Sequence, residues 1–132
     1  KDQDFLYNIF RKEIKDRKMA EFSLTTSKEG QVVIIETIGY LNNVGGERVA
    51  DVCYEEIEKG TKNFLINLGS SKVVNSIGVS ILIEIIEKLQ DINGKLGYYN
   101  LAPIVEKTFN IMGLTKYSTI YKSEKEALEG ME

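Results

Sequence analysis

Two stretches decide the fold of this 132-residue chain: FLINL at residues 64–68 and VNSIGVSIL at residues 74–82. The first is an apolar run with the length of a buried strand, and the second opens a series of apolar residues at helical spacing. Together they place the hydroxyl of Ser76 on the first turn of a helix that follows a core strand. Because the binding sites of α/β folds lie outside the carboxyl ends of the strands, we expect the function to depend on this hydroxyl.

Strand-like and helix-like segments alternate on both sides of this pair. A run rich in β-branched residues at 31–40 predicts a central strand, and residues 21–27, ahead of a turn at 28–30, predict its hairpin partner. Asn43 is placed to cap a helix that runs to about Lys59. Further strands are expected at residues 63–68, 95–100 and 118–121. Further helices are expected to begin at Ser76 and at Pro103, and a capping box of Ser123 with Glu126 predicts a terminal helix.

The alternation predicts a single α/β domain at residues 21–132, with a mixed β-sheet, an N-terminal hairpin and alternating helices joined by right-handed crossovers. Residues 1–20 precede this domain as an extension. Apolar residues in the extension recur at three- and four-residue spacing, which predicts an additional amphipathic helix over about residues 3–17. These residues are Phe5, Leu6, Ile9, Phe10 and Ile14.

The composition argues against several classes of function. A net charge of −3 gives no support to nucleic-acid binding, which needs a basic face. Residues 1–18 carry six basic and four acidic side chains, which leaves 11 basic and 16 acidic ones, a net charge of −5, in the rest of the chain. No apolar run approaches the ~20 residues of a membrane span, and the first residues do not have the pattern of a signal peptide, so we expect a cytoplasmic protein. A first residue of Lys rather than Met is consistent with a fragment of a longer protein.

No catalytic set can be assembled from the sequence. The chain has no histidine, which rules out a Ser-His-Asp triad, and a pair of Ser76 with Lys72 is the formal alternative. Cys53 is the only cysteine, so there is neither an internal disulfide nor a cysteine-based zinc site. Because Cys53 lies on the apolar stripe of its helix, we expect a buried, inert thiol.

The remaining acidic and glycine-rich features have simple explanations. The acidic pairs are expected on solvated helix faces rather than at a metal site, and they are Glu55-Glu56 and Glu84 with Glu87. Neither a P-loop nor a GxGxxG fingerprint occurs. We therefore expect no enzyme activity, no cofactor and no metal.

The pair Asn75-Ser76 has a structural interpretation as a helix cap. Side-chain oxygens of Asn and Ser accept hydrogen bonds from the unpaired N–H groups of a first helical turn. Capping and regulation are compatible, because a phosphate on Ser76 would lie by the positive end of the helix dipole, near N–H donors. A partner docked there would meet roughly two new negative charges.

Six segments share the order and spacing of the motifs of a known family. They are IGYLN at residues 38–42, NSIGVS at 75–80, NGK at 93–95, PIV at 103–105, FNIMGL at 109–114 and SEKEAL at 123–128. Over about residues 21–130 the chain resembles the STAS domain of bacterial anti-sigma-factor antagonists. The signature of that family has the form Asp-Ser-Ser/Ala-Gly-Leu-Gly, and residues 75–80 stand in its place.

The resemblance implies a function in protein-switched signalling. The unmodified antagonist binds an anti-sigma factor that is a serine kinase, phosphorylation of the signature serine releases it, and a serine phosphatase resets it. Here Ser76 corresponds to the phosphorylated serine, Asn75 to the preceding acid and Gly78 to the signature glycine. The partner surface implied by the resemblance comprises Leu41, Asn42, Asn75, Ser76, Ile77, Gly78 and Ser80.

Departures from the signature leave other interpretations open. Asn75 replaces an acid, Ile77 replaces a small residue and Ser80 replaces a second glycine. The first alternative is a STAS scaffold module that is not phosphorylated, in a larger signalling or transport system, and the second is a small-ligand-binding domain. The N-terminal helix is not part of the family's minimal domain. It could cover an apolar surface of the same domain, mediate a homodimer or connect to an upstream sensor.

Overall fold

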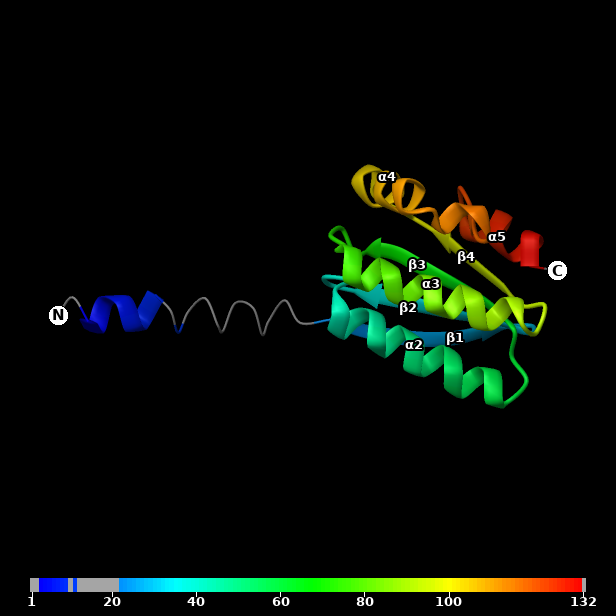
Figure 1. The fold of residues 1–132 in the computed structure, drawn as a ribbon, viewed down its shortest axis with the longest axis horizontal. Helices are drawn as coiled ribbons and strands as arrows, with labels where there is room; N and C mark the ends of the chain where they lie inside the picture. Colours follow the sequence, from blue (N-terminus) through cyan, green and yellow to red (C-terminus); the bar gives the residue numbers. More distant parts are fainter. Residues whose placement is uncertain (1–2, 10, 12–21, 132) are drawn as a thin grey trace.

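The computed structural model describes residues 3–9, 11 and 22–131. Residues 22–131 contain a five-stranded sheet in the order β1-β2-β3-β4-β5, in which β1 is antiparallel to β2 and every later pair is parallel (Figure 1). The strands are β1 (Ser23–Glu29), β2 (Val32–Ile38), β3 (Asn63–Ser70), β4 (Lys95–Tyr99) and β5 (Thr119–Ile120). The helices are α2 (Asn43–Glu58), α3 (Ser76–Gln90), α4 (Pro103–Met112) and α5 (Glu124–Met131), with a 3-10 helix η1 (Leu114–Lys116).

This arrangement confirms the predicted mixed α/β sheet with an N-terminal hairpin and alternating helices. The hairpin turn lies later than residues 28–30, because β1 continues to Glu29, which pairs with Val32. The turn itself consists of Gly30 and Gln31. Gly30 has φ 62°, the positive value that a two-residue hairpin loop requires at its first position.

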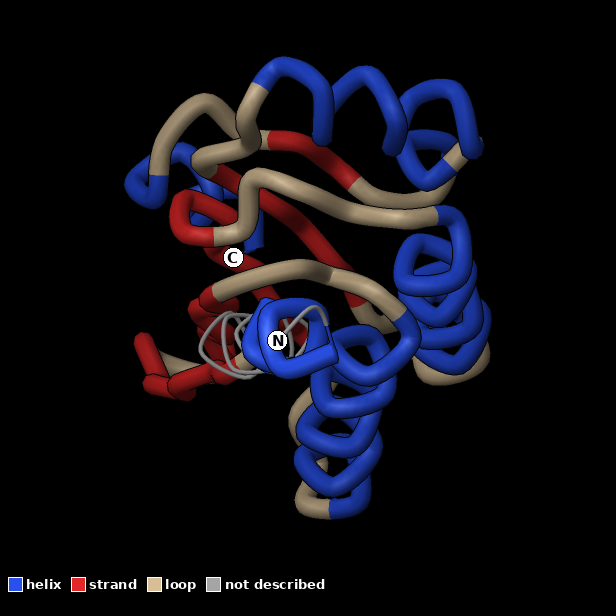
Figure 2. Tube along the Cα trace, turned by 90° about the vertical axis from the view of Figure 1, so that its left-hand side faces the viewer, coloured by secondary structure: helices blue, strands red, loops and turns tan. Residues whose placement is uncertain are grey.

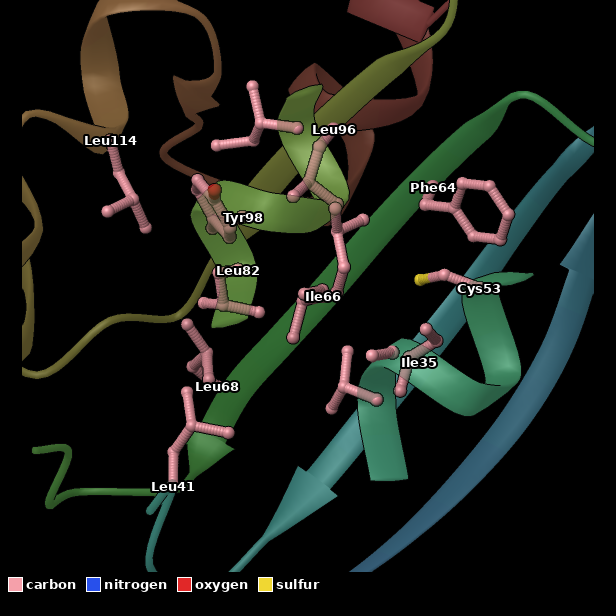
Figure 3. Close-up of a cluster of buried hydrophobic side chains, with 14 of the residues drawn as sticks. Ile35, Leu41, Cys53, Phe64, Ile66, Leu68, Leu82, Leu96, Tyr98 and Leu114 are labelled. Atoms are coloured by element: carbon pink, nitrogen blue, oxygen red, sulfur yellow. The ribbon is translucent and has the colours of Figure 1, made fainter. Parts of the chain in front are cut away.

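Helices cover both faces of the sheet, and two cores result. The larger core lies between the sheet and α2, α3 and α4, and Figure 3 shows part of it, including Ile35, Cys53, Phe64, Ile66 and Leu82. The smaller core lies on the opposite face against α5 and consists of Val32, Ile34, Leu65, Tyr99, Ala127 and Met131. Successive residues of a strand face opposite sides, so a strand between two cores is apolar throughout. This explains the unbroken apolar run at the start of β2.

Tyr98 joins β4 to the elements that follow it. Its ring packs edge-on against Phe109 of α4, with ring centroids 4.9 Å apart. Its hydroxyl is hydrogen-bonded to the Ser118 hydroxyl at 3.0 Å, ahead of β5. Burial raises the pKa of Tyr98, so the phenol stays protonated and the buried polar group is satisfied.

The helix caps differ in detail from the prediction. Asn42, not Asn43, is the N-cap of α2, because Asn42 has the extended backbone of a cap and Asn43 is already helical. Before α5, Ser123 Oγ accepts from the Glu126 N–H at 3.1 Å, as a capping box requires. The Glu126 carboxylate accepts from the Lys122 N–H at 3.3 Å rather than from Ser123, so the reciprocal half of the box is displaced by one residue.

The N-terminal extension contains the helix that the sequence predicts. Residues 3–9 and 11 are helical, and their side chains are exposed. The rest of the predicted helix, including Phe10 and Ile14, lies outside the described residues, as does the expected boundary at residue 20.

Among residues 3–9, 11 and 22–131, no helix has the length and apolar character of a bilayer span, and no three acidic, cysteine or histidine residues cluster as a metal site would require. The acidic pairs are exposed as expected, with one exception. The Glu56 side chain is 15% exposed and lies 3.5 Å from the Lys28 ammonium and 3.3 Å from that of Lys59. Glu56 therefore joins α2 to β1 rather than only facing water.

Cys53 provides a test of the larger core. The side chain is fully buried, and burial raises the pKa of the thiol from 9.0 to about 12. At pH 8 this lowers the thiolate fraction about 1,000-fold, and the thiolate is the reactive form. We expect DTNB to modify native protein slower than urea-unfolded protein by at least this factor. An exposed cysteine introduced as Ser80→Cys is the control, and native Cys53 reacting as fast as that control would contradict the buried position.

Candidate functional site

The candidate site lies where β2 and β3 end and α2 and α3 begin, at one end of the sheet (Figures 1 and 2). Backbone hydrogen bonds join the two connecting segments. The Leu41 N–H donates to the Val73 carbonyl at 3.0 Å, and the Asn75 N–H donates to the Leu41 carbonyl at 3.1 Å. The Gly39 N–H donates to the Ser70 carbonyl at 2.9 Å. These bonds extend the parallel pairing of β2 and β3 beyond the strands and hold the two helix starts side by side.

Each of the two helices begins with an asparagine cap. Asn42 Oδ1 accepts from the Gly45 N–H at 3.1 Å, and Asn75 Oδ1 accepts from the Gly78 N–H at 2.8 Å. A side-chain acceptor at this position satisfies one of the unpaired N–H groups of a first turn. Two positive helix ends and their remaining N–H donors therefore lie in the same region.

Close packing between the two helix starts depends on glycine. A Cβ atom on Gly78 would collide with the Leu41 carbonyl oxygen and would lie 3.0 Å from the Asn42 carbonyl oxygen. A Cβ on Gly46 would lie 2.9 Å from Ile81 Cδ1 and 3.3 Å from the Gly78 Cα. Gly78 is thus required by sterics, because only hydrogen fits where α3 passes the segment before α2.

Ser76 is the first residue of α3, and its side chain is exposed. The Asn75 side chain supplies the cap, and the Ser76 hydroxyl makes no hydrogen bond within the described part of the chain. Lys72 likewise makes no bond to it there, so the Ser–Lys pair considered from the sequence has no geometric support. The Ser76 carbonyl accepts from Ser80 Oγ at 2.7 Å, which directs the Ser80 hydroxyl back along the helix.

The structure brings together all the site residues that the sequence suggested but exposes only some of them. Ser76, Ile77 and Ser80 are exposed, and Asn42 and Asn75 are half-buried. Leu41 and Gly78 are buried, so both support the junction within the domain, and a partner contact at these two residues stays a prediction.

Three further exposed residues at this end were missing from the sequence-based set. Tyr40 precedes the Asn42 cap, Val44 lies on the first turn of α2, and Val73 precedes the Asn75 cap. With Ile77 they form what we name the apolar patch: Tyr40, Val44, Val73 and Ile77, exposed by 41–56%. A sequence signal existed, since each is an apolar residue two positions from Asn42 or Asn75. Exposed apolar residues gathered at one end of a domain are typical of an interaction site.

A buried pair of hydroxyls supports the site from below. Thr37 Oγ1 of β2 and Ser71 Oγ, just after β3, lie 2.7 Å apart, and both residues are fully buried. The Ser71 N–H also donates to the Leu68 carbonyl at 3.0 Å. This polar link fixes the segment that leads from β3 to Ser76.

Comparison with known proteins agrees with this fold. The family model of the STAS domain matches residues 23–127. This chain belongs to the STAS domain family. The STAS domain described here is similar to BtrV of Bordetella bronchiseptica, which is named as a candidate anti-sigma factor antagonist. The two sequences are 23% identical over 104 residues, which cover 79% of this chain and 90% of BtrV.

Solved structures share the STAS fold at low sequence identity. An anti-sigma factor antagonist from Mycobacterium paratuberculosis is similar with a TM-score of 0.74 at 19% identity, over 85% of this chain and 95% of that chain. The phosphorylated form of the Bacillus cell fate determinant SpoIIAA is similar with a TM-score of 0.66 at 20% identity, over 83% of this chain and 100% of that chain.

The collision at position 78 predicts the effect of a single methyl group. We expect Gly78→Ala to lower the free energy of unfolding by at least about 1 kcal/mol, because the Leu41 carbonyl or the start of α3 must shift. Ser80→Ala on the exposed side of the same helix is the control and should change stability by no more than about 0.5 kcal/mol. Urea unfolding followed by circular dichroism measures both. Equal stability of the two variants would contradict the close contact.

Proposed function

We propose that this STAS domain regulates a protein partner of the anti-sigma factor class and that phosphorylation of Ser76 switches the interaction. The partner would be a serine kinase, and a serine phosphatase would reset Ser76. The observation that carries the proposal is an exposed hydroxyl at a helix start, beside an apolar patch. The naming of BtrV and the phosphorylated form of SpoIIAA support the same class of function.

The surroundings of Ser76 suit a phosphoacceptor. Its hydroxyl is exposed and is not committed to a hydrogen bond in the described residues, so a kinase could bind it and remove its proton. The product phosphate would lie at the positive end of α3, near the N–H groups of the first turn. The fold should therefore tolerate the modification with little loss of stability.

The same phosphate would oppose docking. It adds about −1.5 to −2 charges between Val73 and Ile77, two members of the apolar patch. A partner that buries this patch would have to remove water from the phosphate without a matching cation, which costs free energy. The switch would thus act on the docking surface and leave the fold unchanged.

The proposed contact surface combines direct and supporting residues. The apolar patch and the polar side chains of Asn42, Asn75, Ser76 and Ser80 would face the partner. Leu41 and Gly78 would hold the two helix starts in the docking geometry. We further propose that the regulatory domain spans residues 21–132 and that residues 1–20 are an extension of it.

A STAS scaffold that is not phosphorylated is the second candidate. Asn75 supports it, because its amide caps α3 without the carboxylate that the family signature has before the serine. Recognition of the patch by a partner would then need no chemical change at Ser76.

Phosphorylation can be tested directly. We expect incubation with the cognate kinase and ATP to add one phosphate on Ser76, detected by mass spectrometry of proteolytic fragments. Ser27→Ala, on the exposed part of β1 outside the proposed contact surface, should still be modified, and Ser76→Ala should not. Phosphate only at other positions, or none with a kinase shown to be active on another substrate, would contradict the switch.

Affinity for the isolated partner separates the two candidates. We expect Ser76→Asp to weaken binding at least about tenfold, because charge beside the apolar patch disfavours docking. Asn110→Asp adds the same charge on the exposed side of α4 and is the matched control, expected to leave the affinity unchanged. Titration calorimetry gives both values. An unchanged affinity of Ser76→Asp would favour the scaffold.

A further inference from the structure

The N-terminal helix and the apolar patch are two exposed apolar surfaces of one chain. In the helix, the side chains of Phe5, Leu6 and Tyr7 are 62–66% exposed and that of Ile9 is 43% exposed. Burying such surfaces against each other would be favourable, since removing apolar area from water stabilises association. The question is which surface of the domain the helix fits.

The entry point of the extension lies beside the apolar patch. Phe22 is buried under α2, where its ring leaves no room for a side chain at Gly45, since a Cβ there would lie 2.7 Å from it. Arg48 Nη1 donates to the Phe22 carbonyl at 3.1 Å. The extension is therefore anchored at the first turns of α2, and Val44 of the patch lies on the first of these turns.

The length of the connection permits contact between the helix and the patch. Twelve residues separate Ile9 from Phe22, and a chain spans at most about 3.3–3.6 Å per residue. The maximum span is thus about 45 Å, which is more than the length of any helix of the domain. A short distance between the anchor and the docking surface also raises the effective concentration of the helix there.

Charge favours the α2 side of the domain. Residues 11–18 carry five basic and two acidic side chains, a net charge of +3. α2 carries five acidic side chains and one basic one, a net charge of −4. At physiological salt such charges act over about 8 Å, enough to hold a tethered segment along one side. The first turn of α2 has no acidic side chain and three of the five lie at residues 55–58, so the attraction favours the α2 side of the domain but does not by itself select the patch end.

The other large apolar surface is less suitable. It comprises Ile104 and Ile111 of α4 and Tyr117, which follows η1, and these side chains are 61–73% exposed. Between Pro103 and Lys116 there are one acidic and two basic side chains, a net charge of +1, which does not attract a basic segment. α4 and η1 themselves pack against α3 rather than against α2, where the extension is anchored.

We propose that the N-terminal helix, residues 3–9, docks on the apolar patch of its own domain and competes with the partner for it. The proposal rests on the proposed function for its consequence, because a partner must then displace the helix. A helix docked about nine-tenths of the time lowers the apparent affinity for the partner about tenfold. The extension is thereby an intramolecular regulator of access to Ser76.

The contact can be tested without any partner. A nitroxide label on Asn8→Cys reports proximity, and the buried Cys53 stays unlabelled in the native protein. We expect the label to cause loss of the amide signals of Val44 and Val73 in the NMR spectrum of the isotope-labelled full chain. Adding Leu6→Asp should restore these signals, whereas Ile111→Asp, the matched control on α4, should not.

Three results would overturn the proposal. Signals lost around Ile111 instead would place the helix on α4, and signals lost nowhere would leave it undocked. Signals lost from isotope-labelled chains without nitroxide when they are mixed with unlabelled chains that bear it would identify a second copy as the occupant. Because this experiment does not involve phosphate or partner, its outcome is separate from that of the kinase assay at Ser76.

Discussion

The close approach of the Gly78 backbone to the Leu41 carbonyl is the contact on which the rest of the site depends. It lets α3 begin directly beside the segment that leads from β2 into α2. The bonds of Leu41 to Val73 and of Asn75 to Leu41 then align the two caps. The exposed residues of the site lie on the two helix starts and connecting segments that this junction holds together.

In the proposed switch, the same chemistry would serve structure and regulation. A helix start needs acceptors for its unpaired N–H groups, and Asn75 provides one of them. Because the asparagine takes that role, the neighbouring Ser76 hydroxyl is available for modification. A phosphate there would add an acceptor at a position already suited to negative charge, so the modification alters the surface and not the core.

The sequence predicts those features that depend on neighbours along the chain. The apolar spacing of α3, Pro103 at the start of α4 and the cap at Asn75 are local patterns, and the structure has all three. The choice between Asn42 and Asn43 as cap depends on backbone angles that two adjacent asparagines do not reveal. The apolar patch and the pairing of Glu56 with Lys28 join residues far apart in sequence. The sequence around a single valine does not show whether its side chain is buried or exposed.

The buried hydroxyl pair beneath the site constrains how this domain can evolve. Removing the Thr37 hydroxyl would leave that of Ser71 buried without its 2.7 Å partner, at a cost of about 1–3 kcal/mol, whereas removing the Ser71 hydroxyl leaves Thr37 Oγ1 only its longer bond to the Asn67 carbonyl at 3.5 Å. Replacing both with apolar residues of similar shape is close to neutral. Selection therefore acts on the two positions as a unit, and substitutions at one should be accompanied by substitutions at the other among related sequences.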